Sequence, residues 1–322
     1  MKAYITLLFI TLLFLLLVPS AMASDINNER YHRVSTLKVT TLSTMLANRG
    51  MGEWGYAALV EVDGRKILFD TGMRPETVVQ NAAELGIDLS DVEDVILSHN
   101  HGDHTGGLVA LRQSLRGKNP RALTRIHVGR GIFSQRVGSE NRMLAMKKEL
   151  EKDGVAFNEY TNVAEIYPGV WLTGNVARVH PERNWGGNSK VITADGEVAD
   201  NIPEDMSLVI DTEQGFVLIS GCGHAGIINT MEHITAKIHP GKIFTAIGGF
   251  HLMSADDQHL QWTAEKLRYF GLTKMIGAHC TGINSLYTLR HLLGSDRKNM
   301  VVGSVGDHFS LQDGVRPGGI AR

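Results

Sequence analysis

A short run of potential metal ligands constrains this chain more than any other feature. Its four candidate ligands fall within six positions of the sequence: His99, His101, Asp103 and His104. The apolar run Val95-Ile96-Leu97 precedes them and predicts a buried strand. Gly106-Gly107 follows and opens an apolar segment that predicts the start of a helix. The cluster is therefore expected where a core strand ends, the chain turns and side chains can converge.

The spacing of these residues indicates how they would divide between cations. Residues i and i+2 of an extended segment point to the same side, so His99 and His101 can bind one cation. Asp103 and His104 follow in the turn and can face a second cation. Imidazole and carboxylate ligands suit Zn²⁺, with Fe or Mn as other candidates, and one or two ions per chain are expected. The alternative is a polar loop with solvated or capping histidines, against which the density of ligands argues.

Two further histidines have the same local setting as the cluster. His224 follows the apolar run 216–219 and His279 follows the run 275–278, and both lie in turns that contain glycine. The alternative for each is a capping or surface histidine. The expected ligand groups are His99, His101 and His224 for one cation, and Asp103, His104 and His279 for the other.

The cluster resembles the signature of the metallo-β-lactamase fold superfamily. Upstream of it, Phe69-Asp70-Thr71-Gly72 is similar to the first motif of that superfamily. The resemblance covers about residues 37–310 and implies that Asp70 supports the histidine loop from outside the ligand set, as metal-bound histidines usually require. It also implies a four-layer αββα sandwich, whereas periodicity alone predicts only a mixed α/β fold.

Periodicity places the main elements along the chain. Strands are expected at 37–43, 56–62, 66–70, 94–98, 125–128, 206–211, 215–220, 242–247 and 274–277, with short strand-like runs over 155–173. Helices are expected at 74–85, 139–153, 226–238, 256–270 and 283–293. A loop from 174 to about 201 is rich in Gly, Asn, Arg and Pro, and loops of this length are often functional. The pattern fits two mixed sheets packed face to face with helices outside.

Two cysteines, Cys222 and Cys280, lie in motif-like loops close to candidate ligands. Many members of the superfamily carry a Gly-Asp whose carboxylate bridges the metals, where this chain has Gly221-Cys222. Three explanations stay open: Cys222 is a ligand, His224 replaces the bridge, or one metal is bound less tightly. We expect buried, unligated thiols, with Cys222 just outside the ligand set. A disulfide, or ligation of metal by one thiol, is the alternative.

Three segments together resemble one branch of the superfamily, the dihydropterin-ribofuranosylaminobenzene-phosphate synthase-like proteins. They are Ile219 to Asn229, Ala246 to Leu252, and Ala278 to Gly282. The resemblance implies a transferase acting on a methanopterin precursor as one possible function. Fold-level analogy is weak evidence for a substrate, and the export predicted below argues against a cytosolic step of coenzyme biosynthesis.

The long loop also contains candidate substrate-binding residues. Arg178, His180 and Arg183 lie in it, and His251 lies in the turn Gly249-Phe250-His251. Together they are expected to line a pocket for an anionic group of the substrate. The alternative is that the arginines order the loop by binding backbone carbonyls.

The first residues of the chain predict export. Tyr4 to Val18 is almost purely apolar, and Ala21-Met22-Ala23 then gives an Ala-x-Ala cleavage site. We expect a signal peptide over 1–23, a flexible arm over 24–36 and a single domain over 37–322. The alternative is an uncleaved membrane anchor, but the apolar run is short and ends in proline. The expected location is secreted or periplasmic, with no stable membrane anchor.

Composition and motifs together predict an enzyme. The chain is 43% hydrophobic with a formal charge of −2, which suits a large core and gives no reason to expect a nucleic-acid partner. We expect a hydrolase that uses metal-activated water on an ester, phosphoester or amide bond of a small, anionic substrate, with Asp103 as catalytic residue. The alternatives are a transferase of the synthase type and a metal-binding protein without turnover, which the missing Gly-Asp motivates.

Overall fold

The computed structural model describes residues 31–138, 140–182, 184, 189–193 and 196–321. The predicted signal peptide, the arm up to residue 30, and Arg183 lie outside the described residues. Residues 33–322 form one compact unit. Within the described ranges, no helix has both the length and the apolar character needed to span a membrane.

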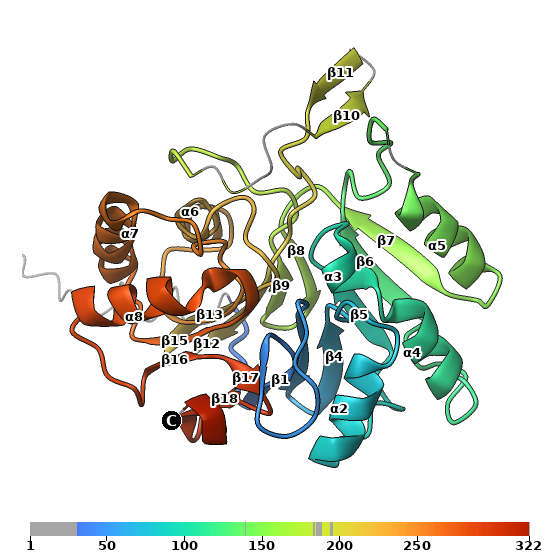
Figure 1. The fold of residues 1–322 in the computed structure, drawn as a ribbon, viewed down its shortest axis with the longest axis horizontal. Helices are drawn as coiled ribbons and strands as arrows, with labels where there is room; N and C mark the ends of the chain where they lie inside the picture. Colours follow the sequence, from blue (N-terminus) through green and yellow to red (C-terminus); the bar gives the residue numbers. More distant parts are fainter. Residues whose placement is uncertain (1–30, 139, 183, 185–188, 194–195, 322) are drawn as a thin grey trace, which may run out of the picture. The chain divides into compact units, whose positions relative to one another are not determined.

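Two large sheets form the centre of this unit (Figure 1). The first runs in the order β19 (Gly314–Arg316), β18 (His308–Ser310), β1 (Leu37–Ser43), β3 (Ala57–Val62), β4 (Arg65–Phe69), β5 (Asp94–Leu97), β6 (Arg125–Gly129) and β7 (Ala156–Tyr160). The second runs β16 (Met300–Val302), β15 (Lys274–Gly277), β14 (Ile243–Gly248), β13 (Gly215–Ser220), β12 (Leu208–Thr212), β9 (Val170–Leu172) and β8 (Ala164–Tyr167). Two small pairs are β2 (Leu46–Ala47) with β17 (Ser304–Val305), and β10 (Lys190–Thr193) with β11 (Gly196–Ala199).

Helices cover the outer face of each sheet (Figure 1). The first sheet carries α2 (Thr77–Leu85), α4 (Leu108–Leu115) and α5 (Arg142–Glu151), and the second carries α6 (Ile227–Lys237), α7 (Asp257–Tyr269) and α8 (Ile283–Leu292). Three short elements are α3 (Gly102–Thr105) and the 3₁₀ turns η1 (His279–Thr281) and η2 (Gly319–Ala321).

Alternation along the strands explains why the layers stack in this way. On β4, Ile67 and Phe69 belong to the core between the sheets, whereas Leu68 belongs to the core under the helices. On β13, Val217 and Leu218 divide in the same manner. Successive strand side chains point to opposite faces, so strands that are apolar on both faces require a cover on each side. The predicted four-layer αββα sandwich is confirmed.

One side of each sheet, out to its edge strand, is parallel. β4, β5, β6 and β7 run in one direction in the first sheet, and β13, β14, β15 and β16 do so in the second. The carboxyl ends of each set therefore meet at one edge of their sheet, which is where open α/β sheets usually carry their sites.

The long loop predicted from residue 174 differs from the structure in one respect. It contains the short hairpin β10–β11, in which Val191 pairs with Val198. The strands have four residues each and are mostly exposed, so the segment has no apolar periodicity of its own.

An ionic cluster around the buried carboxylate of Asp94 ties the two sheets together. Asp94 on β5 accepts hydrogen bonds from Arg125 Nε (2.8 Å) and His127 Nε2 (2.9 Å) at one oxygen, and from Arg125 Nη2 and Tyr167 Oη (both 2.7 Å) at the other. Tyr167 belongs to β8 of the opposite sheet. Burial opposes ionisation of Asp94, but these hydrogen bonds outweigh it and hold the pKa of the carboxyl well below its usual range.

We expect the Asp94→Asn variant to lose about 2 kcal/mol of unfolding free energy at pH 7, the order for a charged group that loses its hydrogen-bond partner. The unfolded-state pKa is about 3.9, so the contribution of Asp94 is complete above that pH and is lost as the pH falls through the lower folded-state pKa. The variant should therefore lose less stability than the wild type on acidification. Urea unfolding at several pH values tests this.

Asp91→Asn, at an exposed carboxylate paired with Lys66, is the control and should change stability by less than about 0.5 kcal/mol. Equal losses in both variants would contradict the role of the cluster.

Candidate metal centre

All predicted metal ligands follow the carboxyl ends of parallel strands. His99 and His101 follow β5, and Asp103 and His104 lie in α3 directly after them. From the other sheet, His224 follows β13 and His279 begins η1 after β15. Each sheet thus supplies ligands from its own edge.

The structure brings together His99, His101 and His224, which we call the first ligand group. Their ligand atoms lie within 4.8 Å of one another, and the Nε2 atoms of His99 and His224 are 3.2 Å apart. Two nitrogens bound at about 2.0–2.1 Å to one tetrahedral ion are about 3.3 Å apart, so this spacing fits a shared cation.

Hydrogen bonds at the opposite ring nitrogens direct these two Nε2 atoms toward each other. Nδ1 of His99 lies 2.9 Å from Ser98 Oγ, and Nδ1 of His224 contacts the backbone carbonyl of Asn184. A ring that donates through Nδ1 keeps its lone pair on Nε2. Two buried lone pairs facing each other repel unless a cation lies between them, which is the arrangement a metal site needs.

The first ligand group is electrostatically prepared to stay neutral. Burial, followed by the neighbouring imidazoles, lowers the pKa of His99 and His224 well below the usual value. Burial also lowers the pKa of His101, to about 4, although His101 is the most exposed of the three. Neutral imidazole is the form that binds metal.

The second ligand group is Asp103, His104 and His279, and the structure brings these together as well. Asp103 Oδ2 lies 3.7 Å from His104 Nε2 and 3.3 Å from His279 Nε2. Burial opposes ionisation of Asp103, but the two imidazoles outweigh it and lower its pKa. His279 is 1% exposed, and apart from the contact with Asp103 neither of its ring nitrogens has a partner in the described part of the chain. A buried imidazole with so few partners fits a metal ligand.

Asp70 organises both groups from beneath. Its carboxylate accepts hydrogen bonds from Ser98 N, Ser98 Oγ (both 2.8 Å) and His104 Nδ1 (2.7 Å). Through Ser98 it also fixes the ring of His99. Burial disfavours protonation of His104, but Asp70 outweighs it and raises the pKa of that ring. The contacts agree with the supporting role that the resemblance implied for Asp70.

Three residues at this centre have left-handed backbones without being glycine. Asp70, His251 and His279 have φ values of 56°, 49° and 47°. Residues other than glycine rarely adopt this conformation, although aspartate and histidine do so more often than most, and it concentrates at functional sites. Each of the three residues lies within a few positions of the end of a strand.

The two cysteines are buried and are not bonded to each other. Cys222 Sγ lies 3.2 Å from His104 Nε2, in contact with a predicted ligand. Cys280 Sγ instead donates to the carbonyl of Cys222 (3.5 Å) and accepts from the backbone N–H of His251 (3.3 Å).

The predicted substrate residues separate into two sets. His251 borders the centre, with its ring centroid 4.7 Å from that of His224. Arg178 donates to the carbonyls of His224, Asn201 and Ile202, which favours the loop-ordering alternative. His180 packs against Trp262 and lies 3.6 Å from Glu232, on α7 and α6. Arg183 lies outside the described residues.

Sequence reasoning missed three residues of the centre. Ser98 and Asn184 fix histidine rings through the contacts given above. Trp54 is 43% exposed and packs against His279, with ring centroids 4.5 Å apart. Ser98 adjoins the cluster and could have been found from its position, whereas no local signal marks Asn184.

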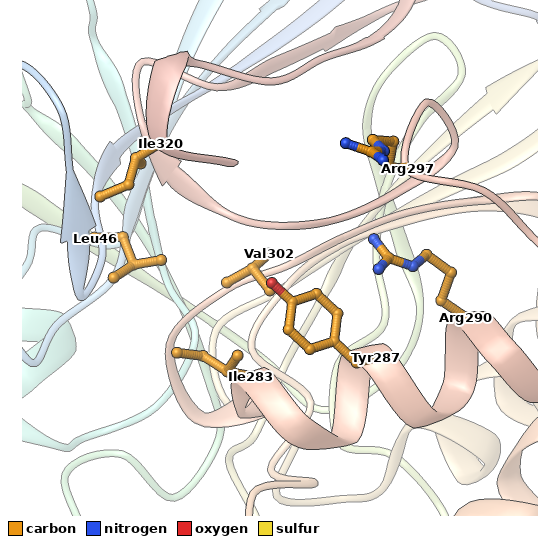
Figure 2. A pocket seen from close by; sticks show the side chains of 7 residues that line it. All are labelled: Leu46, Ile283, Tyr287, Arg290, Arg297, Val302 and Ile320. Carbon is orange, nitrogen blue, oxygen red and sulfur yellow. The ribbon is translucent and has the colours of Figure 1, made fainter. Parts of the chain in front are cut away.

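A cavity of about 270 Å³ lies apart from these ligands, along α8 (Figure 2). It is lined by Leu46, Ile283, Tyr287, Arg290, Arg297, Val302 and Ile320. Figure 2 shows Arg290 and Arg297 on one side of this space, while the Tyr287 hydroxyl points toward Val302. No member of either ligand group lines it, so it is not the metal centre.

Fold and site together define the class of protein. Residues 55–141 match the family model described as the metallo-beta-lactamase superfamily, and this stretch contains Asp70 and the whole cluster. Solved structures with the same fold include Tm1679, described as a metal-dependent hydrolase of the beta-lactamase superfamily (TM-score 0.69, 24% identity, covering 85% of this chain and 98% of that one). Another is the metallo-beta-lactamase fold protein YhfI from Bacillus subtilis (TM-score 0.54, 12% identity, 86% and 100% covered). The chain therefore has the metallo-β-lactamase fold, as its motifs predicted.

Within this class, the chain is similar to one curated relative over most of its length. This is the 7,8-dihydropterin-6-methyl-4-(beta-D-ribofuranosyl)-aminobenzene-5'-phosphate synthase of Methanocaldococcus jannaschii, with 29% identity over 270 residues that cover 79% of this chain and 90% of the relative. The resemblance to the synthase-like branch is confirmed. The names of these relatives agree with the prediction that this chain is an enzyme.

The Asp70→Asn variant should bind metal about 10–100-fold more weakly, since an amide cannot accept all three of the hydrogen bonds that orient His99 and His104. Competition with a chromogenic chelator measures the affinity. Asp257→Asn, at an exposed position in the first turn of α7, is the matched control and should leave the affinity unchanged. Unchanged metal affinity in a folded Asp70→Asn protein would show that the carboxylate does not position the ligands.

Gly221→Ala tests how closely the two sheet edges must approach. A Cβ at residue 221 would lie 2.1 Å from Ser98 Oγ and 2.6 Å from Asp70 Oδ2, so either the strand end or the Asp70 network must shift. We expect loss of metal binding together with a lower melting temperature. Gly117→Ala, where a Cβ meets no atom within 4 Å, should change neither quantity. A variant at Gly221 that keeps full metal content would contradict the close approach.

Proposed function

We propose that the protein is a metal-dependent hydrolase of an ester, phosphoester or amide bond. The observation that carries this proposal is the placement of two complete groups of three ligands side by side, one of which holds His104 against Asp70. When bound, the cations, of which Zn²⁺ suits the ligands best, would lower the pKa of water toward neutrality and polarise the oxygen under attack.

The chain's own residues would prepare this chemistry by position and charge. Asp103 faces both His104 and His279 as an ionised carboxylate, so it offers a negative charge at the edge of the centre that is 17% exposed. Trp54 supplies an exposed aromatic wall against His279. Preorganised charges that need no rearrangement are the main contribution of a protein to such reactions.

The substrate side of the centre supports a small molecule as partner. His251 borders the first ligand group and is the remaining candidate, among the described substrate residues, for contact with an anionic substrate group. We further propose that the protein acts outside the cytoplasm, secreted or in the periplasm. The apolar N-terminal run and its Ala-x-Ala site support this location.

A transferase of the synthase type is the second candidate. The relative from Methanocaldococcus jannaschii favours it, because the similarity extends over 90% of a protein named as a synthase. A metal-binding protein without turnover is the third candidate, which Cys222 in place of the usual bridging carboxylate motivates.

We expect the His101→Ala variant to lose metal from the first ligand group and to lose at least about a hundredfold in hydrolysis, since even indirect partners of metal ligands contribute about 10–100-fold. Elemental analysis and a panel of ester, phosphoester and amide substrates measure the two effects. His291→Ala, at an exposed histidine in the last turn of α8, is the control.

The same panel separates the candidate functions. Product formation that requires only water supports the hydrolase, whereas product that requires a second organic substrate supports the transferase. Metal binding without turnover on any substrate would favour the third candidate. Full metal content and full activity in His101→Ala would overturn the assignment of the first ligand group.

A further inference from the structure

The thiol of Cys222 occupies a position between the two ligand groups. Its Sγ lies 3.2 Å from Nε2 of His104 and within 4.8 Å of a ring nitrogen of His279, both in the second group. It also lies within 4.8 Å of ring nitrogens of His99 and His224 in the first group. Among the described residues, Cys222 takes part in three of the five sets that could hold a metal ion.

The other thiol of the centre is held differently. Cys280 Sγ donates to the carbonyl of Cys222 and accepts from the backbone N–H of His251. It also lies within 4.8 Å of a ring nitrogen of His279, in the second group alone. Cys222 Sγ instead faces the imidazole of His104. Two equally buried cysteines in one centre therefore have different surroundings, and only Cys222 faces both groups.

The local structure after β13 delivers the thiol to this place. Gly221 has no side chain, and a Cβ there would collide with Ser98 and Asp70, so the end of β13 lies directly against the network that orients His104. Cys222 is the next residue and is 3% exposed. Water therefore has little access to the sulfur, whereas ring nitrogens of both ligand groups lie close to it.

We propose that Cys222 is a metal ligand whose thiolate links the two ligand groups, in the position where many related proteins place a bridging carboxylate. The inference rests on the metal centre of the proposed function but not on the reaction catalysed there. Metal–sulfur and metal–nitrogen bonds of about 2.3 Å and 2.0–2.1 Å in a tetrahedral site separate the two ligand atoms by about 3.5 Å, close to the observed contact with His104. On binding, the thiol proton leaves to solvent and the sulfur electron pair forms the bond to the cation, with no change in oxidation state.

Cobalt substitution of the purified full-length protein gives a readout that is independent of activity. Thiolate bound to Co²⁺ absorbs strongly in the near ultraviolet by charge transfer, whereas imidazole and carboxylate ligands do not. The probe is Co²⁺ alone, titrated into metal-free wild type, Cys222→Ser, Cys222→Asp and Cys280→Ser. Cys280→Ser is the matched control because it removes the neighbouring buried thiol.

We expect the charge-transfer band in the wild type and in Cys280→Ser, and its loss in both Cys222 variants. The affinity for the second Co²⁺ should fall at least tenfold in Cys222→Ser. Cys222→Asp should regain most of this affinity without the band, because a carboxylate can bridge. This variant also keeps the test valid if Cys222→Ser does not fold.

Three results would overturn the proposal: no charge-transfer band in a wild type that binds two ions, a band that persists in Cys222→Ser, or a band that is lost only with Cys280. A protein that binds Co²⁺ with the expected band but hydrolyses no substrate would leave this inference intact and contradict the hydrolase. The two failures are therefore distinguishable.

Discussion

The buried carboxylate of Asp70 is the interaction on which the centre depends. It accepts three hydrogen bonds, from the backbone and hydroxyl of Ser98 and from the ring of His104. A carboxylate fully removed from water is tolerated only when such donors surround it, so the loop that carries the cluster has little freedom in how it turns. The same bonds fix which nitrogen of His99 and His104 faces the centre. Asp70 itself has a left-handed backbone, directly after the end of β4.

Local signals made much of this predictable. The cluster after β5, and single histidines after β13 and β15, each combine an apolar strand with a glycine-containing turn, and this pattern is visible without any knowledge of the fold. The contacts that complete the centre depend on distant pairs instead. Asn184 reaches His224 from a loop forty positions away, and Cys222 meets His104 across 118 positions. Arg178 looks like an anion-binding residue in sequence, yet the carbonyls that it binds belong to segments whose approach only the folded chain defines.

The centre also concentrates features that weaken the fold by themselves. It contains buried imidazoles that face one another and backbone conformations that cost about 1–3 kcal/mol each. A bound cation offsets such costs, because a ligand that binds only the folded state stabilises it by about 4 kcal/mol at a free concentration a thousand times its dissociation constant. The proposed metal centre would therefore make the stability of the fold depend on metal occupancy.

Each sheet provides part of both ligand groups, and this has a consequence for how the chain assembles. His99 and His101 come from the first sheet and His224 from the second, while Asp103 and His104 meet His279 in the same way. Neither sheet can form a complete ligand group alone. The residues of each group are distant in sequence, and they come together only when the apolar faces of the two sheets have packed. A complete ligand group therefore requires both sheets to be packed together. Uptake of a cation during refolding would then report the docking of the two sheets.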